Sequence, residues 1–368
     1  MKILFTIPNF ITAGSGRVLA NIALGLDREK FNPMVCVSRK GGAIETELEA
    51  AGIQVIEAPF TVPAKPYLGL LNRCKTVAQV FKPYKFDLWH SFHYSDDYSE
   101  PIIARLAGSR SWVYTKKSMM WGTRAWVLRS LLATRIIADN HEMPEKFFKQ
   151  FGLARKVRVI PHGVDLALFK PITVDQEAYR AALHLPPSAV LVGLVAHLVP
   201  VKGHALLIDA ASKCANVHLL LAGRANDPSY LSQLQTQADQ LGVTGKVHFL
   251  GNIADMPTFL AHLDIIALPS LSRGEGCPVV LLEAMACAKA CIATDVPGSR
   301  DLIEDGISGL LIPPEDSDAL ARAIQRLSVD RDLCARLGAA ARHRVEGHYT
   351  LVREVAALEH LYSEILKV

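Results

Sequence analysis

Residues 265–286 read IIALPSLSRGEGCPVVLLEAMA, a stretch that contains a strand, a glycine-bearing loop and a helix in immediate succession. The apolar run Ile265–Leu268 has the length and composition of a strand that is covered on both faces. Pro278 stands where the helix begins, a position that proline favours because no helical hydrogen bond is lost there. A strand that leads through a loop into a helix is the repeating unit of a parallel α/β sheet.

The same unit recurs in both directions from this stretch. Short apolar runs alternate with helical patterns from Lys2–Ile7 to Ala290–Thr294, and the alternation pauses at residues 165–187, where three prolines occur. We therefore predict an α/β protein with two Rossmann-like parallel-sheet domains, at residues 1–170 and 171–350. A last helix, within residues 351–368, is expected to cross back to the first domain.

The composition is that of a globular protein. Half of the 368 residues are hydrophobic and 21% are charged, which excludes global disorder. The seven cysteines are odd in number and include no Cys-x-x-Cys pair, so a reducing cytosol fits better than a disulfide framework. The N-terminus lacks the features of a signal peptide, and no apolar stretch reaches the roughly 18 residues of a membrane span. We expect a cytoplasmic protein, attached at most to the inner face of a membrane.

Charge is unevenly distributed along the chain. Residues 1–170 carry 24 Lys and Arg against 14 Asp and Glu, whereas residues 171–368 carry 16 against 22. The basic half suggests an anionic partner, such as a phosphorylated acceptor or a lipid surface, but scattered surface charge explains the asymmetry equally well. We expect no nucleic-acid partner. The basic residues concerned include Arg105, Lys116, Lys117, Arg124 and Arg129.

The loop and the helix start of the quoted stretch have the features of a phosphate site. The glycines on either side of Glu275 allow close backbone approach, and the amides of Val279 and Val280 would carry the partial positive charge of a helix N-terminus. Glu275 and Glu283 would flank one ligand. The alternative is a surface loop before a buried helix, but a glutamate between glycines is not needed for packing, so we favour ligand binding.

A second loop, after the apolar run Val190–Val195, carries His197 and Lys202 ahead of a helical pattern. Lysine is a common point-charge partner of phosphate. A lone lysine before a helix is usually solvated, but the phosphate-ready helix in the same domain favours a binding role for Lys202.

Two features of the first half complete the candidates. Gly14, Ser15, Gly16 and Arg17 follow the first strand, and without a third glycine at the dinucleotide spacing they predict an acceptor or phosphate loop rather than an NAD site. His90 and His93 follow another strand, and the sequence leaves open which of them serves a site and which packs in the core. Together with Asp96 they would supply metal ligands, but no metal-ligand motif is evident, and we expect neither a metal nor a cofactor.

With these motifs in place, the chain resembles the retaining glycosyltransferases of family 4, group 1, which have the GT-B fold. The resemblance covers nearly the whole length and is most specific from Glu275 to Glu283. Other matching segments are Ala13–Arg17, Val159–Asp165, Lys202-Gly203, Ala222-Gly223, Pro297–Asp301 and Asp305–Leu311.

The resemblance implies transfer of a sugar from a nucleotide-diphosphate sugar, by default a UDP-sugar, to an acceptor that is a sugar, a lipid-linked molecule or another small molecule. The product would belong to a glycan, lipopolysaccharide, exopolysaccharide or glycolipid. Glu283 would hold the ribose and Glu275 the transferred sugar. The implied donor-binding residues are His197, Lys202, Glu275, Gly276, Val279, Val280 and Glu283, and the implied catalytic residues are His93, Glu275 and Lys202.

The resemblance also implies a mechanism. The family needs no metal, and in its proposed retaining mechanism the leaving phosphate assists deprotonation of the acceptor on the same face. The protein would position the reactants and stabilise charge. Two departures bear on this: His197 stands where the family usually has Arg, and Ala13–Arg17 lacks the carboxylate of the family's Gly-Gly-x-Glu-Arg loop.

Other classes fit parts of the sequence. Asp316-Ser317-Asp318 has the spacing of a metal-dependent glycosyltransferase, but it directly precedes a helical run, where capping explains it better. A nucleotide-sugar epimerase of the same fold would turn over its substrate without an acceptor. A non-enzymatic sugar-binding protein of two domains is usually exported, which the missing signal peptide disfavours. The base, the sugar, the acceptor, the linkage and the oligomeric state are open at this point.

Overall fold

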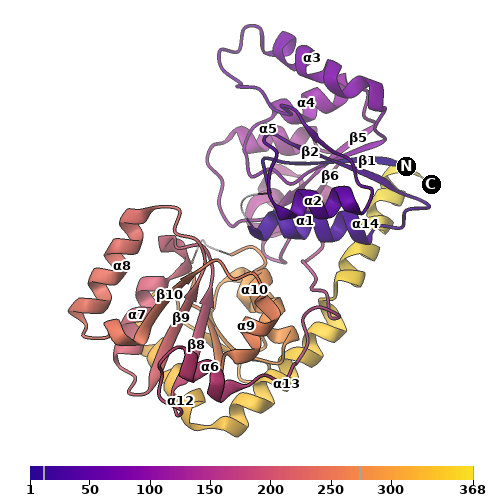
Figure 1. Ribbon diagram of the computed structural model, residues 1–368. Coiled ribbons are helices and arrows are strands. Elements are labelled where there is room, and N and C mark those ends of the chain that lie inside the picture. The colour runs from indigo at the N-terminus through magenta and orange to yellow at the C-terminus, as the bar shows by residue number, and fades with distance from the viewer. Residues whose placement is uncertain (11–12, 273–274, 368) are drawn as a thin grey trace. The chain divides into compact units, whose positions relative to one another are not determined.

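The structure is a computed structural model that describes residues 1–10, 13–272 and 275–367. It divides into two compact units, Met1–His162 with Leu351–Val368, and Gly163–Thr350. Each unit holds one parallel sheet flanked by helices, which confirms the predicted fold class of two Rossmann-like domains (Figure 1). The second unit begins at Gly163 rather than at residue 171, because the Val164 amide donates to the Tyr349 carbonyl oxygen at 2.9 Å and Phe169 is buried in the second core.

The first unit contains a sheet of strand order β3-β2-β1-β4-β5-β6-β7, in which all neighbouring strands are parallel. Because parallel strands end at the same edge, the loops after β4 and β5 lie next to each other. The strands are β1 (Lys2–Ile7), β2 (Asn32–Val37), β3 (Val55–Glu57), β4 (Leu88–Ser91), β5 (Ser111–Lys116), β6 (Arg135–Ala138) and β7 (Val157–Val159).

Helices cover both faces of this sheet, with α3, α4 and α5 on one side and α1, α2 and α14 on the other (Figure 1). The helices are α1 (Ala13–Gly25), α2 (Ala43–Ala50), α3 (Leu70–Phe81), α4 (Ser99–Leu106), α5 (Ala125–Leu132) and α14 (Leu351–Leu366). Short turns of helix are η1 (Lys82–Tyr84), η2 (Pro144–Phe148), η3 (Lys149–Phe151) and η4 (Ala154–Lys156).

The C-terminal helix α14 is joined to the first unit by a buried charge cluster. His162 lies between two carboxylates, with Nε2 3.2 Å from Asp139 Oδ2 and Nδ1 2.9 Å from Glu354 Oε1. Burial alone lowers the pKa of His162, but the charges and hydrogen bonds of Asp139 and Glu354 outweigh it and raise the pKa to about 10. A charged His162 therefore ties the end of β6, the segment after β7 and α14 together.

This cluster predicts a pH dependence of stability. A group whose pKa is raised by folding stabilises the protein fully below its unfolded pKa, near 6.5, and this stabilisation is lost as the pH rises through the folded value of about 10. We expect Glu354→Gln to lower the free energy of unfolding by about 1–3 kcal/mol at pH 6.5 and to flatten its decline toward pH 10, as measured by urea unfolding. Glu364→Gln, on the same helix, is the control, because it removes only exposed ion pairs with Arg135 and Arg158, which contribute little to stability. An equal effect there would contradict the assignment.

The second unit contains a sheet of strand order β10-β9-β8-β11-β12-β13, again with all neighbours parallel. The strands are β8 (Val190–Val195), β9 (Val217–Ala222), β10 (Val247–Gly251), β11 (Ile265–Leu268), β12 (Ala290–Thr294) and β13 (Leu310–Ile312). The helices are α6 (Gln176–Ala182), α7 (His204–Ser212), α8 (Pro228–Gln240), α9 (Met256–His262), α10 (Val279–Ala286), α11 (Pro297–Leu302), α12 (Ser317–Val329) and α13 (Arg331–His348), with the short turns η5 (Pro200–Lys202) and η6 (Thr244–Lys246).

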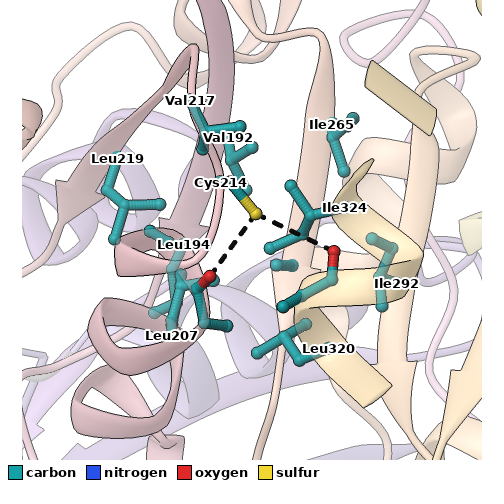
Figure 2. Packing of buried hydrophobic residues seen from close by; sticks show 14 of the residues in the cluster. Val192, Leu194, Leu207, Cys214, Val217, Leu219, Ile265, Ile292, Leu320 and Ile324 are labelled. Atoms are coloured by element: carbon teal, nitrogen blue, oxygen red, sulfur yellow. Dashed lines mark hydrogen bonds between the residues drawn. The ribbon is translucent and has the colours of Figure 1, made fainter. Parts of the chain in front are cut away.

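Side chains of the second sheet alternate between two cores because successive residues of a strand point to opposite faces. Val192 and Leu194 of β8 pack with Leu207 of α7 and Ile324 of α12, as Figure 2 shows, whereas Leu191 belongs to the core on the other face. The Cys214 thiol in the first of these cores donates to the carbonyl oxygens of Ala210 and Ala321, at 3.4 and 3.8 Å (Figure 2). Burial on both faces holds the strand ends in fixed positions.

None of the helices in the described residues is long and apolar enough to cross a membrane.

Candidate active site

The strand order of the second sheet reverses between β8 and β11. The chain proceeds from β8 outward to β9 and β10, and from β11 outward to β12 and β13. At such a reversal the loops after the two central strands leave in opposite directions and open a crevice, where open α/β sheets bind ligands. Residues 196–203, after β8, and residues 269–272 and 275–278, after β11, are the segments concerned, and Gly274 lies outside the described residues.

Backbone contacts hold these two loops together. The Leu271 amide donates to the Val201 carbonyl oxygen at 2.8 Å. Gly203 has a φ of +74°, and a Cβ atom there would lie 1.9 Å from the Pro269 carbonyl oxygen. Gly298 of α11 is equally restricted, since its Cβ would lie 2.4 Å from the Gly276 carbonyl oxygen. The loop that carries Glu275 is therefore fixed from two sides by backbone that only glycine permits.

Glu275 and Lys202 meet across these loops. The Lys202 ammonium lies 2.7 Å from Glu275 Oε1, and the same oxygen accepts a hydrogen bond from the Ser270 hydroxyl. Glu275 is 4% exposed, whereas the Lys202 side chain is 26% exposed. The Thr294 hydroxyl in turn donates to the Ser270 carbonyl oxygen at 2.6 Å. The pair therefore combines a partly exposed ammonium group with a buried carboxylate that fixes its position.

The start of α10 lies directly after this loop. Pro278 precedes the helix in an extended conformation and has no polar side chain with which to cap it, and the first turn holds no acidic residue. The amides of Val279 and Val280 precede the first hydrogen bond of the helix, in which the Leu281 amide donates to the Pro278 carbonyl oxygen at 3.0 Å. Val279, Val280 and Glu283 are the partly exposed residues of α10, so they share one face. This helix end suits an anion.

His197 follows β8 on the same edge of the sheet. It is half-buried, and among the described residues its Nδ1 atom is buried without a hydrogen-bond partner. Its carbonyl oxygen accepts from the Val199 amide at 2.8 Å, which shapes the loop toward Lys202. A buried ring nitrogen without a partner leaves a donor or acceptor available for a ligand.

If His197 contacts a diphosphate, an arginine in its place should bind the diphosphate more tightly, because a guanidinium is always charged and can donate two parallel hydrogen bonds to a phosphate. We expect His197→Arg to strengthen UDP-glucose binding by about 1–3 kcal/mol, as measured by calorimetry. An unchanged affinity would show that His197 only packs beside the loop.

The two histidines of the first unit have different surroundings. His90 is fully buried, with Nδ1 2.7 Å from the Tyr362 hydroxyl and Nε2 2.8 Å from the Thr115 hydroxyl, and burial, with a smaller effect of the Lys117 charge, lowers its pKa to about 3. His93 is partly exposed, borders a cavity, and has a pKa that burial lowers. His90 is thus a packed core residue, and His93 is the histidine that a ligand can reach.

The predicted acceptor or phosphate loop after β1 is helical in the structure. Gly14, Ser15, Gly16 and Arg17 form the first turn of α1 rather than a loop, and Arg17 pairs with Glu47 at 2.6 Å. Residues 11 and 12 lie outside the described residues. The amides of a first turn suit an anion as those of a loop do, so an anion-binding role stays a prediction.

The Asp-x-Asp spacing has a structural role. Asp316 caps α12 by accepting from the Ala319 amide at 2.8 Å, and Asp318 pairs with Lys213 at 2.7 Å. Within the described ranges, no three His, Cys, Asp or Glu side chains are grouped so that they could hold a metal ion, and His90, His93 and Asp96 form no such group.

Ser270 and Thr294 are site residues that our sequence reasoning missed. Both are fully buried and connect Glu275 to the end of β12. The signal was present in the sequence, because each is a hydroxyl residue at the carboxyl end of an apolar strand, where a polar side chain has no packing advantage.

Two parallel-sheet units with an anion-ready helix at the strand-order reversal define the GT-B class of fold. Residues 12–168 match the family described as Glycosyltransferase Family 4, and residues 175–344 match the one described as Glycosyl transferases group 1. The chain therefore belongs to the family 4, group 1 glycosyltransferases.

Individual relatives support this assignment. D-inositol 3-phosphate glycosyltransferase of Mycobacterium bovis is 32% identical over 200 residues, which are 53% of this chain and 41% of that protein. The match thus spans about two-fifths of the length of such curated relatives. The crystal structure of Anabaena Alr3699/HepE in complex with UDP-glucose is 27% identical, with 99% of this chain and 100% of that chain covered and a TM-score of 0.86. A glycosyltransferase from Rickettsia africae, 22% identical, shares the fold with a TM-score of 0.87, covering 100% of this chain and 98% of that one.

Proposed function

We propose that the chain transfers a sugar from a nucleotide-diphosphate sugar, with UDP-sugar as donor, to an acceptor hydroxyl with retention of the anomeric configuration. The Lys202–Glu275 pair beside the start of α10 carries this proposal. A held cation and a helix N-terminus suit a diphosphate, and a buried carboxylate suits the hydroxyls of a sugar. The Anabaena relative, which has UDP-glucose in its crystal structure, supports this donor class.

The proposed roles follow the placement of the side chains. Lys202 and the amides of Val279 and Val280 hold the diphosphate, with His197 beside them. Glu275 and the backbone of Gly276 contact the transferred sugar, and Glu283, one turn into α10, holds the ribose hydroxyls. His93 and the turn Gly14–Arg17 belong to the first unit, and their catalytic and acceptor-binding roles stay predictions.

In the proposed reaction the bond between the anomeric carbon and the diphosphate oxygen breaks, and the acceptor oxygen bonds to the same face of that carbon. The acceptor proton passes to an oxygen of the departing diphosphate. Because negative charge grows on the diphosphate, the Lys202 ammonium and the α10 amides stabilise the transition state more than the ground state. These groups carry the positive charge that the leaving group needs, so we propose a reaction without a metal or another cofactor.

Two measurements test the proposal. Calorimetry with UDP-glucose and UDP should show binding, and incubation of UDP-glucose with a panel of sugar and lipid-linked acceptors should release UDP only when an acceptor is present. Activity should persist with excess chelator. Release of an epimer without an acceptor would instead indicate an isomerase. Binding without turnover would indicate a sugar-binding protein. Failure to bind any nucleotide-sugar would contradict the donor site.

A further inference from the structure

The first unit contains a cavity of about 330 Å³ beyond the carboxyl ends of β4 and β5. Its lining combines cations, aromatic rings, hydroxyls and one carboxylate, among them His93, Tyr94, Asp96, Lys116, Lys117 and Trp121. The volume lies within the range of small-molecule sites. The cavity belongs to the first unit, whereas the donor-binding residues proposed above belong to the second.

Both lysines of the cavity are buried, at 4% exposure for Lys116 and 6% for Lys117. Lys117 Nζ donates to the Phe92 carbonyl oxygen at 2.5 Å and lies 4.3 Å from the centre of the Tyr94 ring. Lys116 Nζ donates to the carbonyl oxygens of Ser118 and Met120 and lies 4.1 Å from the centre of the Trp121 ring. Three acceptors, counting the Ser118 hydroxyl, satisfy Lys116, whereas Lys117 has one acceptor among the described residues for its three protons.

These two ammonium groups differ from other buried cations of the protein. The Arg129 guanidinium lies 3.2 Å from Glu100, and the Arg180 guanidinium lies 2.8 Å from Asp264. Within the described residues, neither Lys116 nor Lys117 has a carboxylate oxygen within 4.0 Å. A buried cation without a counter-ion is costly, because desolvation is not offset by an ion pair. The cavity beside Lys117 is the place where a counter-ion can enter.

The electrostatic surroundings agree with this reading. Burial lowers the pKa of both lysines to about 7. The charge of Asp139 opposes this shift at both lysines, and the charge of Asp96 opposes it at Lys116. The charge of Arg129 lowers the pKa of Lys117 further. Burial also lowers the pKa of His93. An anion in the cavity would reverse these shifts, since a nearby negative charge favours the protonated forms.

We propose that this cavity binds the anionic group, a phosphate ester or a carboxylate, of a small hydroxylated acceptor, with the Lys117 ammonium as its principal partner. Lys116 keeps the segment 118–120 in place and adds positive charge, and the rings of Tyr94 and Trp121 form flat walls for the uncharged part of the molecule. That the bound molecule is an acceptor rests on the proposed function, but the anion site itself does not depend on that function.

The test uses the full chain and four probes: inorganic phosphate, glucose 6-phosphate, glucuronate and glucose. We expect glucose 6-phosphate or glucuronate, and not glucose, to bind, and binding near pH 8 to take up protons, as shown by calorimetry in buffers of different ionisation enthalpy. Phosphate ester and carboxylate are distinguished by which of the two anionic sugars binds more tightly. The proton uptake of the wild type needs no variant, so it is independent of any folding defect.

Lys117→Met should weaken anion binding at least about tenfold, in line with the loss of one charged hydrogen bond. Lys75→Met on α3 removes the same charge from an exposed position and should change nothing. Thermal unfolding checks that both variants fold, and replacement of a buried ammonium by methionine should not lower Tm.

Any one of four outcomes would overturn the proposal. Two concern affinity: anion binding that survives Lys117→Met, and equal affinity for glucose and glucose 6-phosphate. The other two are binding without proton uptake and no binding of any probe. Capture by anionic lipid vesicles that Lys75→Met abolishes would assign the positive charge to a membrane surface instead. Lys117→Met should leave UDP-glucose affinity unchanged. Absence of anion binding in the wild type, with UDP-glucose transfer intact, refutes this inference alone, whereas absent UDP-glucose binding refutes the proposed function.

Discussion

Glu275→Gln is expected to lower kcat by about 100-fold with UDP-glucose as donor, while the affinity for UDP stays close to that of the wild type. Glutamine keeps the size of the side chain but removes the charge that holds the Lys202 ammonium at 2.7 Å and that receives the Ser270 hydroxyl. The loss corresponds to one preorganised electrostatic contact in the transition state. Steady-state kinetics, with an acceptor that the panel of sugar and lipid-linked molecules shows to be used, and calorimetry with UDP measure the two quantities.

Two variants delimit this prediction. Glu177→Gln on α6 changes an exposed carboxylate of the same unit and should leave kcat and KM unchanged. Glu283→Ala should instead act mainly on nucleotide affinity, because Glu283 lies on the partly exposed face of α10 with Val279 and Val280. Wild-type kinetics in both Glu275→Gln and Glu283→Ala would show that the donor site lies elsewhere.

The fold could be predicted because its signals are local. Strands such as Val190–Val195 and Ile265–Leu268 are short apolar runs, and both are found with the bounds expected from the sequence. The unit boundary depends instead on distant partners: Val164 pairs with Tyr349, and His162 pairs with Glu354. Neither contact has a local pattern, so the end of the first unit was expected eight residues later than the structure has it.

The candidate site was predictable in part for the same reason. The position of Glu275, His197 and Lys202 after two apolar strands indicated one edge of a sheet, but not that Lys202 and Glu275 touch. The choice between His90 and His93 depended on where β4 ends, because His90 lies within the strand and is buried, whereas His93 lies just after it. Lys117 was noted only as one of several scattered basic residues, since its missing counter-ion is a property of the folded unit.

The close approach of the two loops makes Gly203 a position of the site that is sensitive to substitution. Gly203 and Gly242 both have left-handed backbone, with φ of +74° and +65°, but a Cβ atom at Gly242 would meet nothing within 4 Å. Gly242→Ala therefore measures the cost of an alanine in this conformation alone, about 1–2 kcal/mol. Gly203→Ala adds a clash with the Pro269 carbonyl oxygen, at 1.9 Å, and backbone cannot rotate away as a side chain does.

We expect Gly203→Ala to lower the free energy of unfolding of the second unit by about 2–3 kcal/mol more than Gly242→Ala, as measured by urea unfolding. The loops must separate to relieve the clash, which breaks the Leu271–Val201 hydrogen bond and moves Lys202, the neighbour of Gly203, away from Glu275. Affinity for UDP-glucose should fall more than about tenfold in Gly203→Ala and stay unchanged in Gly242→Ala. Equal losses of stability in the two variants would mean that the conformation alone, and not the contact between the loops, restricts residue 203 to glycine.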